Sequence, residues 1–342
     1  MRNSQNLDLF VSYVSDVRGR TKELQDFMSH NWFALSKGRT KSIQHYFGKD
    51  KSQYVKIYTA GSSIANIWDN DFLLFCITQL RRRMEEGHVI TSGRLQFSAY
   101  DYVNFRYRKM RGNKRINDES LKKKLLKVSG QDYKNLWSSL ERLHETHVKT
   151  NIKAGGVTEL RAFVWLPEIK KNEKDGIPLG IEVQVADWLV KRISEEKQLL
   201  TFDENYFELT GGLQRWLYLF CRKACGNQRE WRESIVSLHK KSASTDELKF
   251  FKQRLKRIVA KKDLLDYHLS FGEGESKDML IIRKASTYVL GADKTQSKSK
   301  DLAKAAIAEN KKILSKYKVD VLEGEETWSQ RVIDEDRKNQ KK

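Results

Sequence analysis

The chain is poor in the residues that build disulfide scaffolds, rigid loops and membrane spans. Among 342 residues it has only two prolines, and its three cysteines are Cys76, Cys221 and Cys225. An odd cysteine count without regular spacing argues against a disulfide framework, so we expect buried or half-buried small apolar residues instead. No stretch approaches the roughly 18 uninterrupted apolar residues of a spanning helix. Residues 1–16 lack a basic run followed by an apolar stretch, so we expect no secretory signal and a cytoplasmic location.

Signatures of catalysis are also missing. The sequence has no Walker-type phosphate loop, no GxSxG, and no His-x-His pair with a downstream Tyr. His144 and His147 lie three residues apart around Glu145, whereas the zinc-protease motif needs a spacing of four. Asp69 and Asp71 resemble a metal-binding pair, but a helix cap and a first-turn acid explain them better. We therefore expect a protein that is not an enzyme and uses no metal and no cofactor.

What the chain has in excess is positive charge. It carries 65 Lys and Arg against 45 Asp and Glu, a formal net charge of +20. Such a surplus favours a polyanionic partner, which could be nucleic acid, an anionic membrane surface or acidic proteins. A hydrophobic content of 39% is enough to build real cores, and the length favours two domains.

The first half shows helical and strand periodicities in a definite order. We expect a helix over 69–86, a short helix over 99–107, a basic loop over 106–127 and a helix over 131–147. A hairpin of strands 148–152 and 160–166 follows, turning at two glycines. The charged stretch 168–176 is expected to be a domain junction or an inter-strand loop.

The second half repeats this order. We expect helices over 211–225, 234–240 and 244–261, then a hairpin of strands 267–271 and 279–283. Gly211 and Gly212 are interpreted as a helix start or a close-packing feature rather than a phosphate cradle. A long helix, a short helix, a long helix and a hairpin is the order of a winged helix-turn-helix.

The predicted fold is therefore α+β, with two tandem winged-helix domains and a flexible basic C-terminal tail. We expect an N-terminal extension over 1–30, a first winged-helix domain over 31–175 that serves dimerisation and DNA binding, and a second over 176–290 that supplies the main DNA readout. The charged tail over 291–342 is expected to be partly helical or disordered.

The third helix of such a domain enters the major groove of duplex DNA. The outward positions of the first such helix are Lys134, Asn135, Ser138, Ser139 and Arg142. Those of the second are Lys249, Lys252, Gln253, Lys256 and Arg257, with Ser244 near its start. Asn and Gln can pair with adenine and Arg with guanine. The hairpins would be wings whose phosphate contacts are Lys149, Lys153 and Lys277.

Five runs resemble the replication initiator protein A family of plasmids. They are IANIWDND (64–71), RLQFSAYDY (94–102), LGIEVQVADW (179–188), YFELTGGLQRWLYLFCRK (206–223) and SLHKKSAS (237–244). The resemblance implies two winged-helix domains that bind repeated origin sequences (iterons), open the origin with the host initiator and recruit the replicative helicase. It also implies a monomer–dimer equilibrium in which dimers repress the protein's own gene.

Two alternatives stay open at this point. A transcriptional repressor with the same fold would use the same DNA-contacting surface without initiating replication. A nucleic-acid-processing enzyme would need catalytic motifs that the sequence lacks. For any duplex binder of this charge we expect steep salt dependence.

Overall fold

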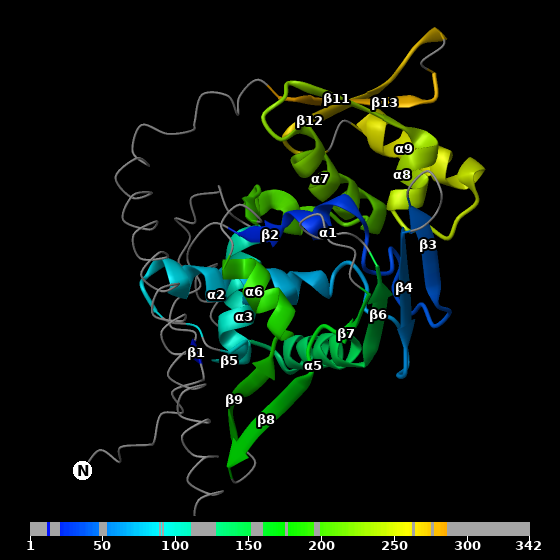
Figure 1. Cartoon of the computed structure of the whole chain (residues 1–342). Coiled ribbons are helices and arrows are strands. Elements are labelled where there is room, and N and C mark those ends of the chain that lie inside the picture. Colours follow the sequence, from blue (N-terminus) through cyan, green and yellow to red (C-terminus); the bar gives the residue numbers. More distant parts are fainter. Residues whose placement is uncertain are drawn as a thin grey trace, which may run out of the picture. The chain divides into compact units, whose positions relative to one another are not determined.

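The structure is a computed structural model that describes residues 12–13, 21–47, 53–88, 90, 92–110, 128–151, 160–174, 177–194, 199–261, 264–274 and 277–285. The chain divides into two compact units, Met1–Leu80 with Ser92–Ala292, and Arg81–Thr91 with Asp293–Lys342. In the second unit the described residues form the end of a helix with Arg–Glu pairs four residues apart. The elements discussed below belong to the first unit, apart from that helix end, and most of them are labelled in Figure 1.

The fold is mixed α+β, as the sequence predicts, and its first half contains two four-stranded sheets. Its longest helices are α2 (Asn70–Glu85), α3 (Ala99–Met110) and α5 (Gly130–Glu145). The first of these sheets has the strand order β1–β5–β9–β8, from β1 (Ser12–Tyr13), β5 (Arg94–Phe97), β9 (Ile177–Gln184) and β8 (Glu168–Lys174). The strand that follows the first helix therefore pairs with the last strand of the hairpin.

The second half pairs its strands in a similar way. Its elements are α7 (Gly212–Cys225), β11 (Glu230–Ser234), α8 (Ile235–Lys241), α9 (Leu248–Lys261), β12 (Tyr267–Phe271) and β13 (Met279–Lys284). The sheet order is β11–β13–β12, so here too the strand after the first helix pairs with the last strand.

The hairpin predicted as the wing of the first half lies in a different sheet from β5. Its two strands do pair, as β6 (Thr146–Thr150) and β7 (Arg161–Val164), but they join a separate sheet. That sheet has the order β3–β4–β6–β7, with β3 (Ile43–Phe47) and β4 (Gln53–Thr59). The hairpin that pairs with β5 is β8–β9, which comes later in the chain.

The charged stretch 168–176 is mostly strand and not loop. Residues 168–174 form β8, which pairs along its length with β9. The predicted domain boundary between 175 and 176 falls between these two paired strands. β8 is an edge strand of its sheet, where long charged side chains reach solvent, and Lys170 Nζ lies 2.8 Å from Glu168 Oε1.

Residues 21–30, predicted as part of an extension, are packed into the fold. β2 (Lys22–Leu24) pairs with β10 (Leu199–Thr201), and α1 (Gln25–Ser29) packs on α7. α6 (Asp187–Ser194) and the 3-10 helix η2 (Glu204–Glu208) complete the connection into the second half. Leu24, Phe27 and Met28 are buried, so this segment contributes to the core.

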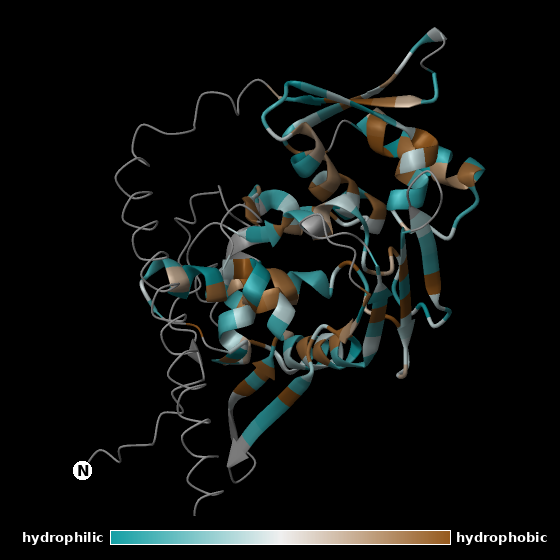
Figure 2. Cartoon of the chain, in the orientation of Figure 1, coloured by the Kyte–Doolittle hydropathy of each residue, from teal (hydrophilic) through white to brown (hydrophobic). Residues whose placement is uncertain are grey.

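The core is rich in aromatic side chains. Phe72, Phe75, Phe97, Tyr102 and Phe105 form one cluster of edge-on and tilted ring pairs. A second cluster surrounds Trp165. Figure 2 shows hydrophobic residues on the helices α5 and α7. Burying one such side chain stabilises the fold by about 1.5–3 kcal/mol. The prediction for the cysteines is confirmed, since all three are buried free thiols.

Gly212 shows why the run TGGLQRWLY needs a residue without a side chain. Gly211 is the N-cap of α7, and Gly212 is the first helical residue. A Cβ on Gly212 would lie 2.1 Å from the carbonyl oxygen of Leu35 and 3.2 Å from the ring of Trp68. This confirms the interpretation of the two glycines as a helix start with close packing.

Candidate nucleic-acid interface

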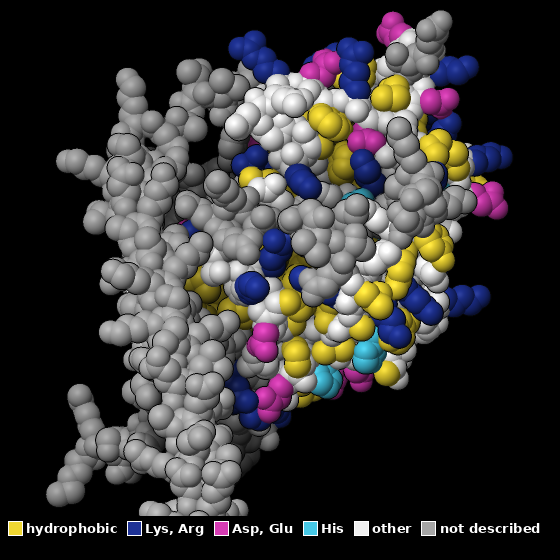
Figure 3. All heavy atoms as spheres, in the orientation of Figure 1, with side chains coloured by type: hydrophobic (Ala, Val, Ile, Leu, Met, Phe, Trp, Pro, Cys, Tyr) yellow, Lys and Arg dark blue, Asp and Glu magenta, His cyan; other side chains and the backbone are white. Residues whose placement is uncertain are grey.

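The helix α9 presents the most basic exposed face among the described elements. Its sequence LKFFKQRLKRIVAK contains six Lys and Arg and no Asp or Glu. Phe251 and Leu255 are buried, which turns the opposite positions outward. The exposed residues of the helix are Lys249, Phe250, Gln253, Lys256, Arg257, Ala260 and Lys261. In Figure 3 Lys and Arg side chains stand out around α8, α9 and the strands β11 and β13.

A tight turn sets the angle of α9 against α8. The hydroxyl of Ser242 accepts from the backbone N–H of Ser244, and Ser244 Oγ accepts from Asp246 N. Ala243 has φ +53, the left-handed conformation that turns the chain. Because these hydrogen bonds favour a turn over a helix, α9 begins at Leu248 and not at Ser244 as predicted. The Ser244 hydroxyl is consequently engaged within the turn.

Two of the cations of α9 have acidic partners. Lys252 Nζ lies 2.7 Å from Asp278 Oδ1, next to the β12–β13 turn, and Arg254 donates to Asp246 at 2.6 Å. Lys252, predicted to contact DNA, therefore also ties the helix to the hairpin. Lys277 is exposed beside Asp278, so its side chain is accessible for the phosphate contact predicted from this hairpin. Among the described residues, Lys249, Lys256 and Arg257 have no acidic partner.

The corresponding helix of the first half, α5, is less basic. It holds two Lys and Arg against three Asp and Glu. Lys134, Asn135 and Ser138 are exposed as predicted. Arg142 instead donates two hydrogen bonds to Asp69, at 2.8 and 2.6 Å, and these hydrogen bonds raise the pKa of its guanidinium. Ser139 is buried.

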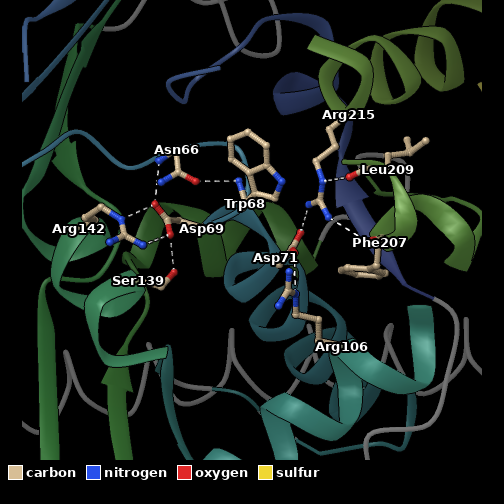
Figure 4. A network of polar contacts seen from close by, with 10 residues as sticks. All are labelled: Asn66, Trp68, Asp69, Asp71, Arg106, Ser139, Arg142, Phe207, Leu209 and Arg215. Atoms are coloured by element: carbon tan, nitrogen blue, oxygen red, sulfur yellow. Dashed lines mark hydrogen bonds and ion pairs between the residues drawn. The ribbon is translucent and has the colours of Figure 1, made fainter. Parts of the chain in front are cut away.

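Asp69 and Asp71 anchor a network of polar contacts (Figure 4). Asp69 accepts hydrogen bonds from the backbone N–H of Asn66 at 2.8 Å, from the Ser139 hydroxyl at 2.8 Å and from Arg142. Asp69 directly precedes α2, but its carboxylate reaches α5 rather than serving as the predicted helix cap. Asp71 lies in the first turn of α2, as predicted, and both carboxylates make long-range contacts.

Asp71 joins α2 to α3 and α7. Arg215 Nη1 donates to Asp71 Oδ1 at 2.6 Å, and Arg106 Nε donates to Asp71 Oδ2 at 3.2 Å. The remaining donors of Arg215 bind the carbonyl oxygens of Leu209 and Phe207. Asp71 is 0% and Arg215 1% exposed, so this is a fully desolvated ion pair whose polar atoms are bonded. The first and second halves are joined here.

A groove of about 820 Å³ lies between β3 and α8. Its lining includes His30, His45, Tyr46, Lys240 and Ser244. Burial lowers the pKa of His45 to about 4. Burial, together with Lys241, His45 and Lys223, lowers the pKa of His30 to about 3. At neutral pH both rings are therefore uncharged, and the positive charge at the groove comes from lysine.

One predicted wing contact, Lys149, does not lie on the hairpin that pairs with β5. Lys149 is exposed on β6, in the sheet apart from β5, β8 and β9. Lys153 lies outside the described residues, as do most of the basic loop 106–127 and the tail over 291–342. Residues 106–110, predicted to begin that loop, instead continue α3, and Arg106 binds Asp71.

No metal centre emerges in the described part of the chain, where no three His, Cys, Asp or Glu side chains gather. Within those same ranges, no helix is both long enough and apolar enough to cross a bilayer.

Comparison with known proteins identifies the family. The profile of a family described as replication initiator protein A matches residues 22–127 and 114–269. The chain belongs to this family. Its members initiate replication, and the sequence-based recognition is confirmed. A protein of Wigglesworthia glossinidia brevipalpis described as "Putative replication protein" is 29% identical over 276 residues, covering 79% of this chain and 91% of the relative.

The fold has a counterpart among solved structures. A crystal structure of domains 2 and 3 of RctB, as selenomethionine derivatives, matches with a TM-score of 0.50 and 13% identity. The match covers 76% of this chain and 98% of the RctB chain. At this identity the likeness concerns the fold alone, and it shows that this mixed α+β arrangement occurs elsewhere.

The runs that carry the family resemblance hold the fold together. Asp69 and Asp71 come from IANIWDND, and Gly212 and Arg215 come from TGGLQRWLY. Sequence reasoning missed this network, although an Arg amid apolar residues at 213–220 was a signal of a buried charge that needs a partner.

Proposed function

We propose that this chain initiates plasmid replication by binding repeated duplex sequences at the origin, with α9 as the principal reading helix. The single observation that supports this most directly is the exposed face of α9, where Lys249, Gln253, Lys256 and Arg257 stand together without an acid in the helix. Arg and Gln match base edges, and Lys matches phosphate.

The proposed architecture is a tandem pair of winged helices. In the second half a helix, a strand, two helices and a hairpin follow one another. The first half has the same order except that β6 and β7 come between α5 and the hairpin β8–β9. In both halves the strand after the first helix pairs with the last strand. The third helices are α5 and α9, and the wings are β8–β9 and β12–β13. The strands β6 and β7 then belong with β3 and β4, which precede α2, in a separate sheet that is not a wing.

The proposed role is non-catalytic. The protein would act by binding DNA, opening the origin with the host initiator and recruiting the helicase, as the resemblance implies. Purified protein should neither nick DNA nor hydrolyse ATP, and either activity would favour a processing enzyme.

A footprint on the native plasmid's origin tests the proposal. Protection should recur at the spacing of directly repeated sequences, and Lys256→Ala with Arg257→Ala should abolish it. Lys191→Ala, which removes an exposed cation from α6, is the matched control and should leave the footprint unchanged. Protection of one palindrome at the protein's own promoter, with the origin untouched, would instead identify a repressor.

A further inference from the structure

The outward face of the sheet β3–β4–β6–β7 combines aromatic and basic side chains. Along β4, Val55 and Ile57 are buried, so Tyr54, Lys56 and Tyr58 point outward. Their cross-strand neighbours share the same side. The outward positions, called the aromatic–lysine face below, are Gln44, Tyr46, Tyr54, Lys56, Tyr58, His147, Lys149, Ala162 and Val164.

These residues stand in rows across the strands. Tyr46 pairs with Tyr54, with ring centroids 6.3 Å apart. Tyr58 pairs with His147, and their rings stack at 5.2 Å with an interplanar angle of 12°. Between these two aromatic rows lies a row that contains Lys56 directly opposite Lys149. Figure 3 shows Lys and Arg side chains over β3 and β4, together with side chains of the hydrophobic class, which includes Tyr.

The placement of the lysines favours an anionic partner. Like charges directly opposite each other destabilise a sheet. Lys56 and Lys149 nevertheless lie close to the same ring. The Nζ atom of each lysine is 5.8 Å from the Tyr58 ring centroid. Among the described outward positions of this sheet, none is Asp or Glu. An anion bound between the aromatic rows would relieve the repulsion that the fold leaves in place.

We propose that the aromatic–lysine face binds single-stranded DNA. Unpaired bases stack on Tyr54, Tyr58 and the exposed Tyr46, while the phosphates between them contact Lys56 and Lys149. Tyr54 and Tyr58 are four residues apart on one strand, roughly 13 Å, which leaves room for the backbone over the lysine row.

An unpaired strand fits this surface better than duplex DNA does. A duplex hides the faces of its bases within the stack and presents only their edges in the grooves, which suit α9. A flat sheet with outward tyrosines offers ring faces instead, and these are complementary to unstacked bases. The use of such a site at an opened origin rests on the proposed function, but the binding itself can be measured separately.

The experiment measures binding of the full chain to a fluorescent oligo-dT by anisotropy, in parallel with binding to an origin-repeat duplex. Tyr54→Ala and Tyr58→Ala should each weaken oligo-dT binding roughly tenfold, and Lys56→Ala should weaken it too. Tyr54→Phe and Tyr58→Phe should keep it, because the ring face remains. Each of these variants should retain duplex binding.

Variants of α9 provide the reciprocal arm. Lys256→Ala with Arg257→Ala should lose duplex binding and keep oligo-dT binding. If the wild-type protein does not bind the duplex but binds oligo-dT, the proposed function is wrong and the proposed site on the aromatic–lysine face is supported. Absence of oligo-dT binding by wild type would overturn the site, as would tighter binding to the matched RNA.

Tyr58→Leu keeps the site testable if the Ala variants do not fold. Leucine preserves apolar bulk without a π face, so oligo-dT binding should fall while thermal stability stays near that of wild type. Unchanged binding in a folded Tyr58→Leu protein would overturn the proposal.

Discussion

At the scale of single residues, Asp71 receives two guanidinium groups in a fully buried position. Arg215 is buried with it, whereas the Arg106 side chain is 37% exposed. Removing one member of a buried ion pair costs about 3–5 kcal/mol, because the remaining charge is left without its counter-ion. An exposed pair contributes at most about 1 kcal/mol.

Asp71→Asn should therefore lower the free energy of unfolding by about 3–5 kcal/mol in urea titrations followed by tryptophan fluorescence. Arg106→Ala is the matched control, and it should lose about 1 kcal/mol or less. Equal losses in the two variants would mean that the Arg215 contact contributes no more than a surface pair.

His45 should make the fold sensitive to acid. Its pKa is about 4 in the folded chain and 6.5 for an ordinary histidine, so the unfolded chain takes up the proton first as pH falls. The stability it contributes is present above pH 6.5 and declines by up to about 1.4 kcal/mol per pH unit toward pH 4. His30, with a pKa of about 3, has the same sign, whereas Glu23, whose pKa burial raises to about 7, has the opposite sign.

Comparing variants isolates the His45 contribution. Between pH 6.5 and pH 5, His45→Gln should lose about 2 kcal/mol less stability than wild type in urea titrations. His268→Gln, at an exposed position of β12, should follow the wild-type curve. A His45→Gln protein as acid-sensitive as wild type would rule out this histidine as a source of the pH dependence.

At the scale of elements, α9 and α5, the third helices of the two proposed winged-helix domains, differ in charge. Lys256→Ala or Arg257→Ala should weaken binding to the cognate repeat by about 1–3 kcal/mol if the residue reads a base. The readout is the ratio of cognate to scrambled duplex affinity by anisotropy. An equal loss on both sequences would assign that residue to phosphate. Lys134→Ala on α5 should cost less, since acids outnumber cations on that helix.

The sequence predicted most helices well and the first wing poorly, for a physical reason. A helix such as α7 is specified by contacts three and four residues apart, and its apolar spacing is visible in the sequence. Strands 146–150 and 161–164 were correctly paired with each other, because a hairpin is also local. Which sheet they join depends on β3 and β4, about 90 residues earlier, and no local pattern encodes that choice.

At the scale of the whole molecule, the net charge of +20 governs how duplex binding responds to salt. If about 6–10 phosphates are neutralised, affinity should fall by about 10³–10⁵-fold between 50 and 200 mM salt, because bound counterions are released. A plot of log K against log salt measures the slope. A flat response would contradict an electrostatic interface.

The sequence by itself determined the basic character, the burial of the cysteines and the order of the main helices, because composition and short-range periodicity encode each of these, and its motifs determined the family. Only the tertiary structure decided that Arg142 binds Asp69, that Asp71 links α2 to α7, and that tyrosines and lysines from three strands share one face. Those outcomes depend on contacts between residues far apart in the chain, and folding alone brings them together.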